Sequence, residues 1–125
     1  MGLITKPSPY SVRETLDKLE ALLHAKGVKV FARIDQAAEA KAAGLQMPDM
    51  ELLIFGNPKG GTPVMLAVPE AGVNLPLKAL AWQDADGKVQ LAFNDPAYLQ
   101  TRYNLPPDLI GPLAAASALI ESATH

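Results

Sequence analysis

The sequence predicts an α+β fold: a single domain over residues 1–125, built on a mixed, largely antiparallel sheet. Three observations support this prediction. Short apolar or alternating segments separate longer segments with helical periodicity, an Asp-Gly turn joins two strand-like segments, and no Pro/Gly/Ser-rich linker divides the chain. The length of 125 residues is also close to the usual size of one domain.

The first predicted elements are an edge strand and a helix. Residues 3–5 are β-prone, and the prolines that follow them end the strand. Ser11 and Glu14 have capping-box spacing, in which the hydroxyl accepts a free backbone N–H and the carboxylate reaches back to the cap residue. Apolar residues then recur at helical spacing as far as Leu23, and Gly27 can take the left-handed conformation that ends a helix.

A second strand and a short helix follow. Residues 28–34 alternate between apolar side chains and charged or aromatic ones, so they predict a strand with one buried face. The apolar positions of this alternation are Val28, Val30, Ala32 and Ile34. Asp35 stops the strand and is placed to cap an alanine-rich helix over residues 37–43, which Gly44 ends.

The middle of the chain predicts a buried strand, a loop and a helix. Residues 52–55 are continuously apolar, and residues 56–62 form a loop rich in glycine and proline. Thr62 and Pro63 match a cap residue followed by proline at the first helical position, so we expect a helix to begin there. Pro69 predicts a kink or a second short helix within this segment.

The last third of the chain predicts a hairpin and two helices. Residues 77–83 and 88–93 flank an Asp-Gly turn, which favours two antiparallel strands. Asp95 before a proline repeats the combination of cap and first helical position, and Asn104 can end this helix. The alanine-rich segment over residues 109–120 has apolar residues at helical spacing and predicts a terminal helix packed on the sheet.

Composition and charge exclude several classes of function. The 11 basic and 13 acidic side chains nearly cancel, and no basic cluster is interleaved with aromatic residues, so we expect no nucleic-acid binding. The absence of cysteine excludes disulfides and thiolate chemistry. No stretch approaches the roughly 20 apolar residues of a membrane span, and the N-terminus lacks the apolar segment of a signal peptide. We therefore expect a cytoplasmic protein that has no membrane partner.

The loop over residues 56–62, which runs from Gly56 to Thr62, is the strongest candidate for a binding site. Its glycines would let a ligand approach the backbone, Lys59 supplies a positive charge, and the amides of the helix that follows favour an anion. Two glycines separate Lys59 from Thr62, so this is not a P-loop, in which the lysine directly precedes Ser or Thr. The alternative is that the loop only turns the chain between strand and helix.

No catalytic or metal-binding motif is evident in the sequence. Asp35 and Glu39 could form a carboxylate pair for acid–base chemistry or a divalent metal, but helix capping and solvation also account for them. The only histidines, His24 and His125, lie in the last turn of a predicted helix and at the terminus. We therefore expect no metal site and no cofactor.

Five motifs together carry a resemblance to a known family. They are IDQAAEA (34–40), LIFGNPK (53–59), GTP (61–63), LPLK (75–78) and NDPAYL (94–99). By these motifs, and over nearly its whole length, the chain resembles the bacterial domain-of-unknown-function 302 family. The resemblance implies a TBP-like fold, with a curved, mainly antiparallel sheet and helices on one face, and frequent dimers. Gln36 and Glu39 replace a histidine and a glycine common in the family, and the resemblance transfers no catalytic residues.

Three hypotheses for function follow. The leading one is a small-ligand-binding or regulatory domain with a polar pocket for a small anionic ligand at strand ends. The expected pocket residues are Asp35, Gln36, Asn57, Lys59 and Thr62. The second is an enzyme with Asp35 as general base and with Asn57 and Thr62 as hydrogen-bond donors. The third is a structural or partner-binding homodimeric domain.

The predicted hairpin over residues 77–93 also predicts the state of assembly. Ala79 and Ala81 alternate with Leu80 and Trp82, so the first strand is apolar on both faces. A sheet that is covered on one side normally alternates apolar with polar residues. We therefore expect a homodimer in which a second subunit covers the surplus face, with Trp82 near the contact. The alternative is that the terminal helix or a long loop of the same chain covers it.

Overall fold

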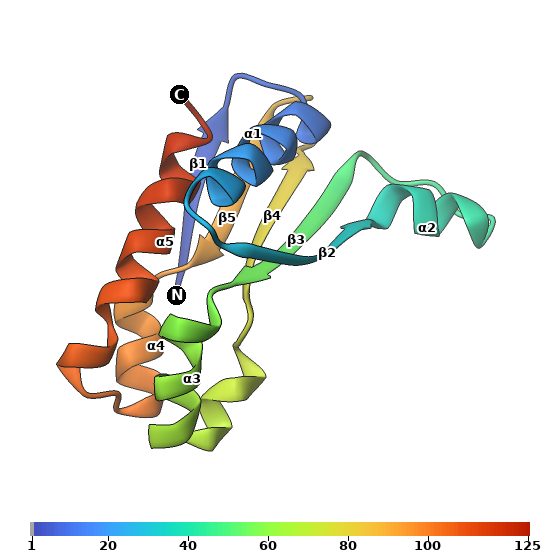
Figure 1. The fold of residues 1–125 in the computed structure, drawn as a ribbon. Helices are drawn as coiled ribbons and strands as arrows, with labels where there is room; N and C mark the ends of the chain where they lie inside the picture. The colour runs from blue at the N-terminus through green and yellow to red at the C-terminus, as the bar shows by residue number, and fades with distance from the viewer. Residues whose placement is uncertain (1) are drawn as a thin grey trace.

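The computed structural model describes residues 2–125 and is organised around a five-stranded sheet (Figure 1). The strand order is β1-β5-β4-β3-β2, and every neighbouring pair is antiparallel. The α+β class is therefore confirmed, and the sheet, which we expected to be mixed, is antiparallel throughout. The strands are β1 (Leu3–Ser8), β2 (Lys29–Asp35), β3 (Met50–Gly56), β4 (Leu77–Gln83) and β5 (Val89–Asn94).

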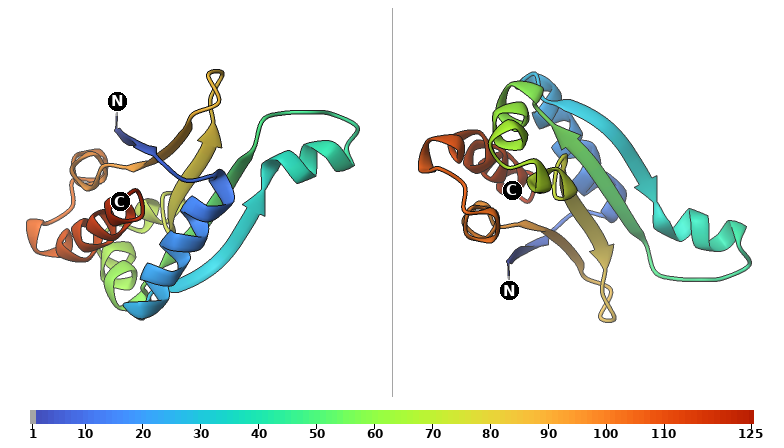
Figure 2. Two further views of the ribbon diagram at one scale, coloured as in Figure 1. Left: turned by 90° about the horizontal axis from the view of Figure 1, so that it is seen from above. Right: turned by 90° about the horizontal axis from the view of Figure 1, so that it is seen from below.

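The helices occupy three places around the sheet. Helices α1 and α5 lie on one face, α3 and α4 lie at one end of the sheet, and α2 projects away from the body (Figures 1 and 2). Their bounds are α1 (Val12–Ala25), α2 (Gln36–Ala42), α3 (Pro58–Ala67), α4 (Pro96–Tyr103) and α5 (Gly111–Ser122), with short 3-10 helices η1 (Pro69–Val73) and η2 (Pro107–Leu109). Helices that pack on a single sheet face agree with the expected architecture.

The main core lies between the sheet and helices α1 and α5. The apolar stripe predicted for the first helix is completely buried at Leu16, Leu19 and Leu23, and it packs on alternate residues of β3, β4 and β5. The residues that the strands contribute are Leu53, Phe55, Ala79, Ala81, Leu91 and Phe93. A smaller second core joins α3, α4, η1 and α5 at the end of the sheet through Val64, Ala71, Leu99, Leu105 and Leu113.

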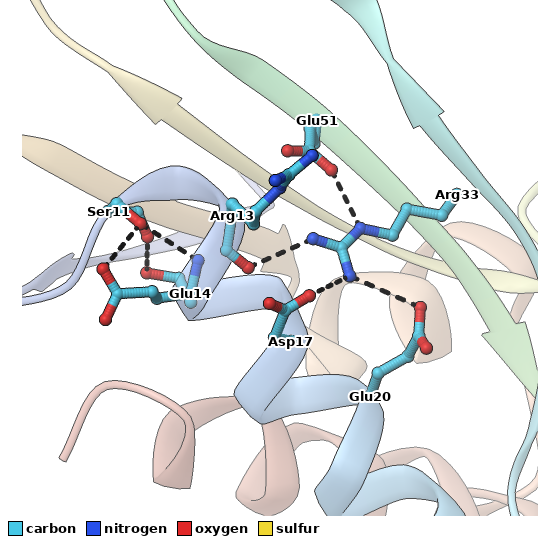
Figure 3. Close-up of polar contacts among 8 residues, drawn as sticks. Ser11, Arg13, Glu14, Asp17, Glu20, Arg33 and Glu51 are labelled. Carbon is cyan, nitrogen blue, oxygen red and sulfur yellow. Dashed lines mark hydrogen bonds and ion pairs between the residues drawn. The ribbon is translucent and has the colours of Figure 1, made fainter.

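Several helix ends confirm the capping signals in the sequence. The Ser11 hydroxyl accepts the N–H of Glu14 at 3.1 Å and contacts the Glu14 carboxylate at 3.0 Å (Figure 3). Asp95 Oδ1 accepts the N–H of Ala97 at 3.0 Å at the start of α4. That helix ends at Asn104, whose backbone is left-handed with φ 50°. These ends depend on short-range bonds, and for that reason the sequence alone predicts them.

The start of α3 corrects the prediction of a loop over residues 56–62. The helix begins at Pro58, with Asn57 as its cap, and Pro63 lies inside it. The sequence offers a cap followed by a proline twice, at Asn57 and again at Thr62, and the earlier pair forms the helix start. The Asn57 side chain accepts the N–H of Lys59 at 3.0 Å, which satisfies a first-turn donor as soon as the strand ends. Most of the expected loop is therefore helix.

A β-bulge in β2 corrects the predicted alternation of residues 28–34. The register shifts between Val30 and Ala32, so that Val30 pairs with Phe55 on the face covered by helices, whereas Ala32 pairs with Ile54 on the opposite face. The four apolar positions of this strand therefore divide between the two faces. The bulge also turns Arg33 toward α1 and leaves the Phe31 side chain 46% exposed.

Arg33 joins β2 to α1 and β3 (Figure 3). Its guanidinium contacts Asp17 Oδ1 at 2.6 Å and Glu51 Oε1 at 2.8 Å, and it lies 3.6 Å from Glu20 Oε1. Burial by itself lowers the pKa of Arg33, but the hydrogen bonds and charges of Glu51 and Asp17 outweigh burial, so the pKa is raised. The cluster ties the first helix to the edge of the sheet through long-range contacts.

The two main carboxylates of this cluster are expected to contribute unequally to stability. The Glu51 side chain is 12% exposed, whereas the Asp17 side chain is 60% exposed. Glu51→Gln should lower the free energy of unfolding by about 1–3 kcal/mol, because it weakens a charged hydrogen bond that is shielded from water. Asp17→Asn should cost less than about 1 kcal/mol, as for other exposed ion pairs. Urea denaturation of both variants measures the difference, and equal losses would contradict this ranking.

The second face of the sheet carries apolar side chains and is not covered by α1 or α5. We call it the open face. Its half-buried apolar side chains are Ile34, Met50, Leu52, Ile54, Leu80 and Trp82. The terminal helix, which we considered as a cover for Leu80 and Trp82, packs instead on the face that carries Ala79 and Ala81.

Candidate functional site

A cavity of about 500 Å³ lies where β2, β3, α3 and α5 meet. Val28 lines the cavity just before β2, Phe31 lines it as the bulged residue of β2, and Phe55 comes from the end of β3. The remaining walls come from α3, from the segment that leads into β4, and from the first half of α5. This volume falls within the roughly 300–1,000 Å³ of pockets that bind small molecules.

The lining of the cavity is mainly apolar. Its large apolar side chains are Val28, Phe31, Phe55, Met65, Leu75, Leu77, Leu113 and Leu119. The lining residues with polar side chains are Lys26, Asn57 and Thr62. A cavity of this composition suits a ligand that is largely apolar and has a polar group at one end.

The glycines of α3 serve helix packing as well as the cavity wall. Gly60 is buried, and a Cβ atom added to it would lie 2.6 Å from Cβ of Pro112 on α5. Its missing side chain therefore allows α3 and α5 to approach closely and to form one side of the cavity. Gly61 also lines the cavity, with Met65 Cε as the nearest atom to an added Cβ at 4.0 Å.

The expected pocket residues divide into two groups in the structure. Asn57 and Thr62 line the cavity, and Lys59 is exposed on α3 outside its lining. Asp35 and Gln36 lie at the opposite end of β2, because Lys29 pairs with Gly56 whereas Asp35 pairs with Glu51. Six residues of strand correspond to about 20 Å. The five residues therefore do not form a single pocket.

The separation of Asp35 also removes the catalytic arrangement that we considered. Asp35 is exposed and caps α2, where its Oδ1 accepts the N–H of Ala38 at 2.9 Å. A general base has to lie within hydrogen-bond reach of the reacting group, directly or through one water. Asp35 cannot act on a molecule that is held by Asn57 and Thr62. In the described part of the chain, no three acidic or histidine side chains gather as a metal site would require.

The start of α3 is not an anion site of the kind that we expected. Pro58 has no N–H, the N–H of Lys59 donates to Asn57 Oδ1, and the N–H groups of Gly60 and Gly61 donate to Asn57 O at 2.9 and 2.8 Å. The first-turn donors that would bind an anion are thus engaged within the helix. A charged group of a ligand has Lys26 as its cationic neighbour in this cavity.

Sequence reasoning missed most of the cavity wall. Phe31 became available only through the bulge. Lys26 follows α1, Met65 lies on α3 and Leu119 lies on α5, so these three residues are far apart in the sequence. The signal that was available is Phe31 itself, an aromatic residue on the side of a predicted strand that was otherwise occupied by charged residues.

A solved structure and curated proteins resemble this chain. The crystal structure of an uncharacterized conserved DUF302 protein from Bacillus stearothermophilus has a TM-score of 0.81 and 22% identity, and the match covers 99% of this chain and 96% of that one. At that identity the likeness establishes the fold.

Two proteins named "Fluoride-specific ion channel FluC 1" are 48% identical over 104 residues, or 83% of this chain. The match covers 41% of the protein from Brucella suis biovar 1 (strain 1330) and 38% of that from Brucella abortus biovar 1 (strain 9-941). The chain thus spans about two-fifths of the length of these relatives. No helix within residues 2–125 is long and apolar enough to cross a membrane.

The family model described as "Domain of unknown function DUF302" matches residues 4–123. The matched range includes all or nearly all of every strand, and it includes helices α1 and α5. The five motifs found in the sequence also lie within it. The chain therefore belongs to the DUF302 family.

Proposed function

We propose that this domain binds a small, largely apolar molecule in the cavity between β2, β3, α3 and α5. The observation that carries the proposal is the cavity itself, about 500 Å³ in volume with apolar walls. The apolar walls of this cavity are open to water, and a ligand that covers them gains free energy at roughly 25 cal/mol per Å² of apolar surface removed from water. The bulge that presents Phe31 to the cavity also supports the proposal, because β-bulges are over-represented next to functional sites.

The ligand is expected to carry a polar or anionic end. Lys26 supplies a cation among the lining residues, and the side chains of Asn57 and Thr62 supply hydrogen-bonding groups. The expected ligand therefore still has a negatively charged group, but this group is attached to an apolar body. The charged group is expected to lie near Lys26 rather than near Lys59. Medium-chain carboxylates have this chemistry.

A thermal-shift series tests the proposal. Octanoate and decanoate should raise Tm, octanol should do so less, and inorganic phosphate and AMP should have no effect. A ligand at 100 times its Kd stabilises the folded state by about 2.7 kcal/mol, which corresponds to an increase in Tm on the order of 10 °C for a domain of this size. If no amphiphile in the series raises Tm, the proposal is wrong.

Filling the cavity should abolish this binding. Ala115→Trp places a large ring on a lining position of α5, so it should remove the Tm increase given by decanoate. Ala118→Trp is the matched control, because Ala118 is an exposed residue of the same helix that does not line the cavity. Isothermal titration of both variants measures the affinity. Equal binding by both would place the ligand elsewhere.

A second proposal concerns the relatives named as fluoride channels. The matched segment takes up about two-fifths of their length, and we propose that the channel lies in the remainder, with a DUF302 domain attached as an accessory. The present chain would then act beside a fluoride channel. A test is fluoride efflux from proteoliposomes that contain the unmatched part of the Brucella suis protein, with and without this chain. An unchanged efflux rate, together with no co-purification, would refute this role.

We also propose that the protein is a cytoplasmic homodimer formed through the open face. The support is the group of apolar side chains around Trp82 and Leu80, which α1 and α5 leave uncovered. An apolar sheet face gains free energy when it is removed from water, at roughly 25 cal/mol per Å². The lining of the ligand cavity, at the end of the sheet beside α3 and α5, includes neither Trp82 nor Leu80, so dimer formation through these residues leaves the cavity accessible.

A further inference from the structure

A long excursion of the chain between β2 and β3 stands away from the body of the protein. It comprises the 14 residues 36–49, with α2 followed by an extended return segment, and we call it the arm. Figures 1 and 2 show it projecting beyond the end of the sheet. None of its 14 residues is buried.

The arm has too few contacts of its own to account for its structure. Helix α2 has seven residues, and isolated helices shorter than about 12–15 residues are marginal in water. The cap at Asp35 and the alanine-rich composition favour the helix but supply no packing. The return segment adds Leu45, which is 65% exposed, and Met47, which is 36% exposed. The arm therefore presents two apolar side chains, Leu45 and Met47, that belong to neither of the two cores of residues 2–125.

The open face continues directly into the base of the arm. Ile34 and Met50 lie on this face at the ends of β2 and β3 from which the arm departs. The apolar surface thus extends from Leu80 and Trp82 in the middle of the sheet to the two strands that carry the arm. One surface that includes both a flat face and a projection can match a second copy of itself across a two-fold axis.

The size of the open face indicates that the arm is part of the contact. Five strands about 4.8 Å apart and about six residues long present roughly 500 Å² of flat area. A stable protein–protein interface covers about 800 Å² on each partner. The apolar side chains of the open face come from only three of the five strands, β2, β3 and β4, so this apolar area is smaller still and the unburied arm is the part of the chain beside it that can enlarge the contact.

We infer that the arm of one copy packs across the open face of a second copy, and that the second copy's arm packs on the first in return. This inference rests on the proposed homodimer and adds the contact that holds it. Leu45 and Met47 then become buried against the partner, and α2 gains the packing that a short helix needs. The small side chains of α2 allow it to lie close to the strands.

Single-cysteine variants test the contact, because the natural chain contains no cysteine. Ala42→Cys marks the arm and Leu80→Cys marks the open face. Each chain then has one thiol, so a short bis-maleimide can only join two different chains. A mixture of the two variants, one of them tagged, should give a cross-linked mixed dimer. Ala42→Cys mixed with Ala118→Cys, on the opposite side of the sheet, should give none.

Removal of the arm supplies a second measurement. Replacing residues 36–50, which are the arm and Met50 at the start of β3, by Asn-Gly joins the paired residues Asp35 and Glu51 by a two-residue hairpin turn. The variant should be a folded monomer by circular dichroism and light scattering. It should still bind decanoate, because the cavity lies at the other end of β2.

The outcomes separate the arm from the dimer. If the protein is dimeric but cross-links form only between two Leu80→Cys chains, or if the variant without the arm stays dimeric, the arm contact is wrong and the homodimer stands. A monomeric natural protein overturns both. Mixed cross-links together with a monomeric deletion variant establish the exchange of arms.

Discussion

Trp82→Glu is expected to convert the protein from a dimer to a monomer, so that the mass measured by light scattering falls from about twice 13.3 kDa to 13.3 kDa. Trp82 lies on the open face, beside Leu80 and directly opposite Met50. A carboxylate placed in an apolar interface without a partner costs several kcal/mol, and two-fold symmetry places two of them there. Loss of that much free energy raises the dissociation constant by at least a thousandfold.

The fold of the separated subunit should survive this change. Trp82 is half-buried in the isolated chain and takes no part in either core, so the circular dichroism spectrum should be unchanged. Leu66→Glu is the control, because Leu66 is 78% exposed on α3 and lies away from the open face. Its mass should remain that of the dimer. A Trp82→Glu protein that is still dimeric would place the subunit contact elsewhere.

Truncation of the two phenylalanines of the cavity should affect different properties: Phe55 should affect stability, and Phe31 should affect ligand binding. Phe55 is completely buried in the main core, and Phe55→Ala should lower the free energy of unfolding by about 3–5 kcal/mol through lost transfer energy and a new void. That is a large share of the 5–15 kcal/mol that stabilises a typical domain. Urea denaturation measures this loss of unfolding free energy, and the m-value should be unchanged.

Phe31→Ala provides the comparison for this experiment. Phe31 is 46% exposed and lies outside both cores, so its removal should cost less than about 1 kcal/mol of stability. It forms part of the cavity wall, and its loss should weaken decanoate binding severalfold. If Phe31→Ala destabilises the fold as much as Phe55→Ala does, Phe31 is a core residue and the cavity is not open as described.

Elements with short-range signals could be predicted from the sequence. The capping box at Ser11, the Asp-Gly hairpin turn and the stop at Asn104 all appear in the structure, because their bonds join residues at most four positions apart. The start of α3 was misplaced for a related reason. Two equivalent cap signals stand five residues apart, and sequence proximity does not decide which of them meets the end of β3.

The site was predicted only in part. The segment around Asn57 and Thr62 does line the cavity, but Asp35 and Gln36 lie about 20 Å away along β2. The prediction assumed that the residues after β2 and the residues after β3 lie at the same end of the sheet. In an antiparallel sheet, the end of one strand pairs with the start of the next. Polar residues that follow β2 and polar residues that follow β3 therefore lie at opposite ends of the strands.

The sequence by itself determined the class of fold, the order of its elements and most helix ends, since these depend on periodicity and on local hydrogen bonds. Tertiary structure decided the rest. The bulge at Phe31 divides the residues of β2 between two faces, Arg33 finds its carboxylates on α1 and β3, and Gly60 allows α3 to close on α5. Each of these requires residues that are distant in sequence to meet, and the cavity and the open face exist only after they have met.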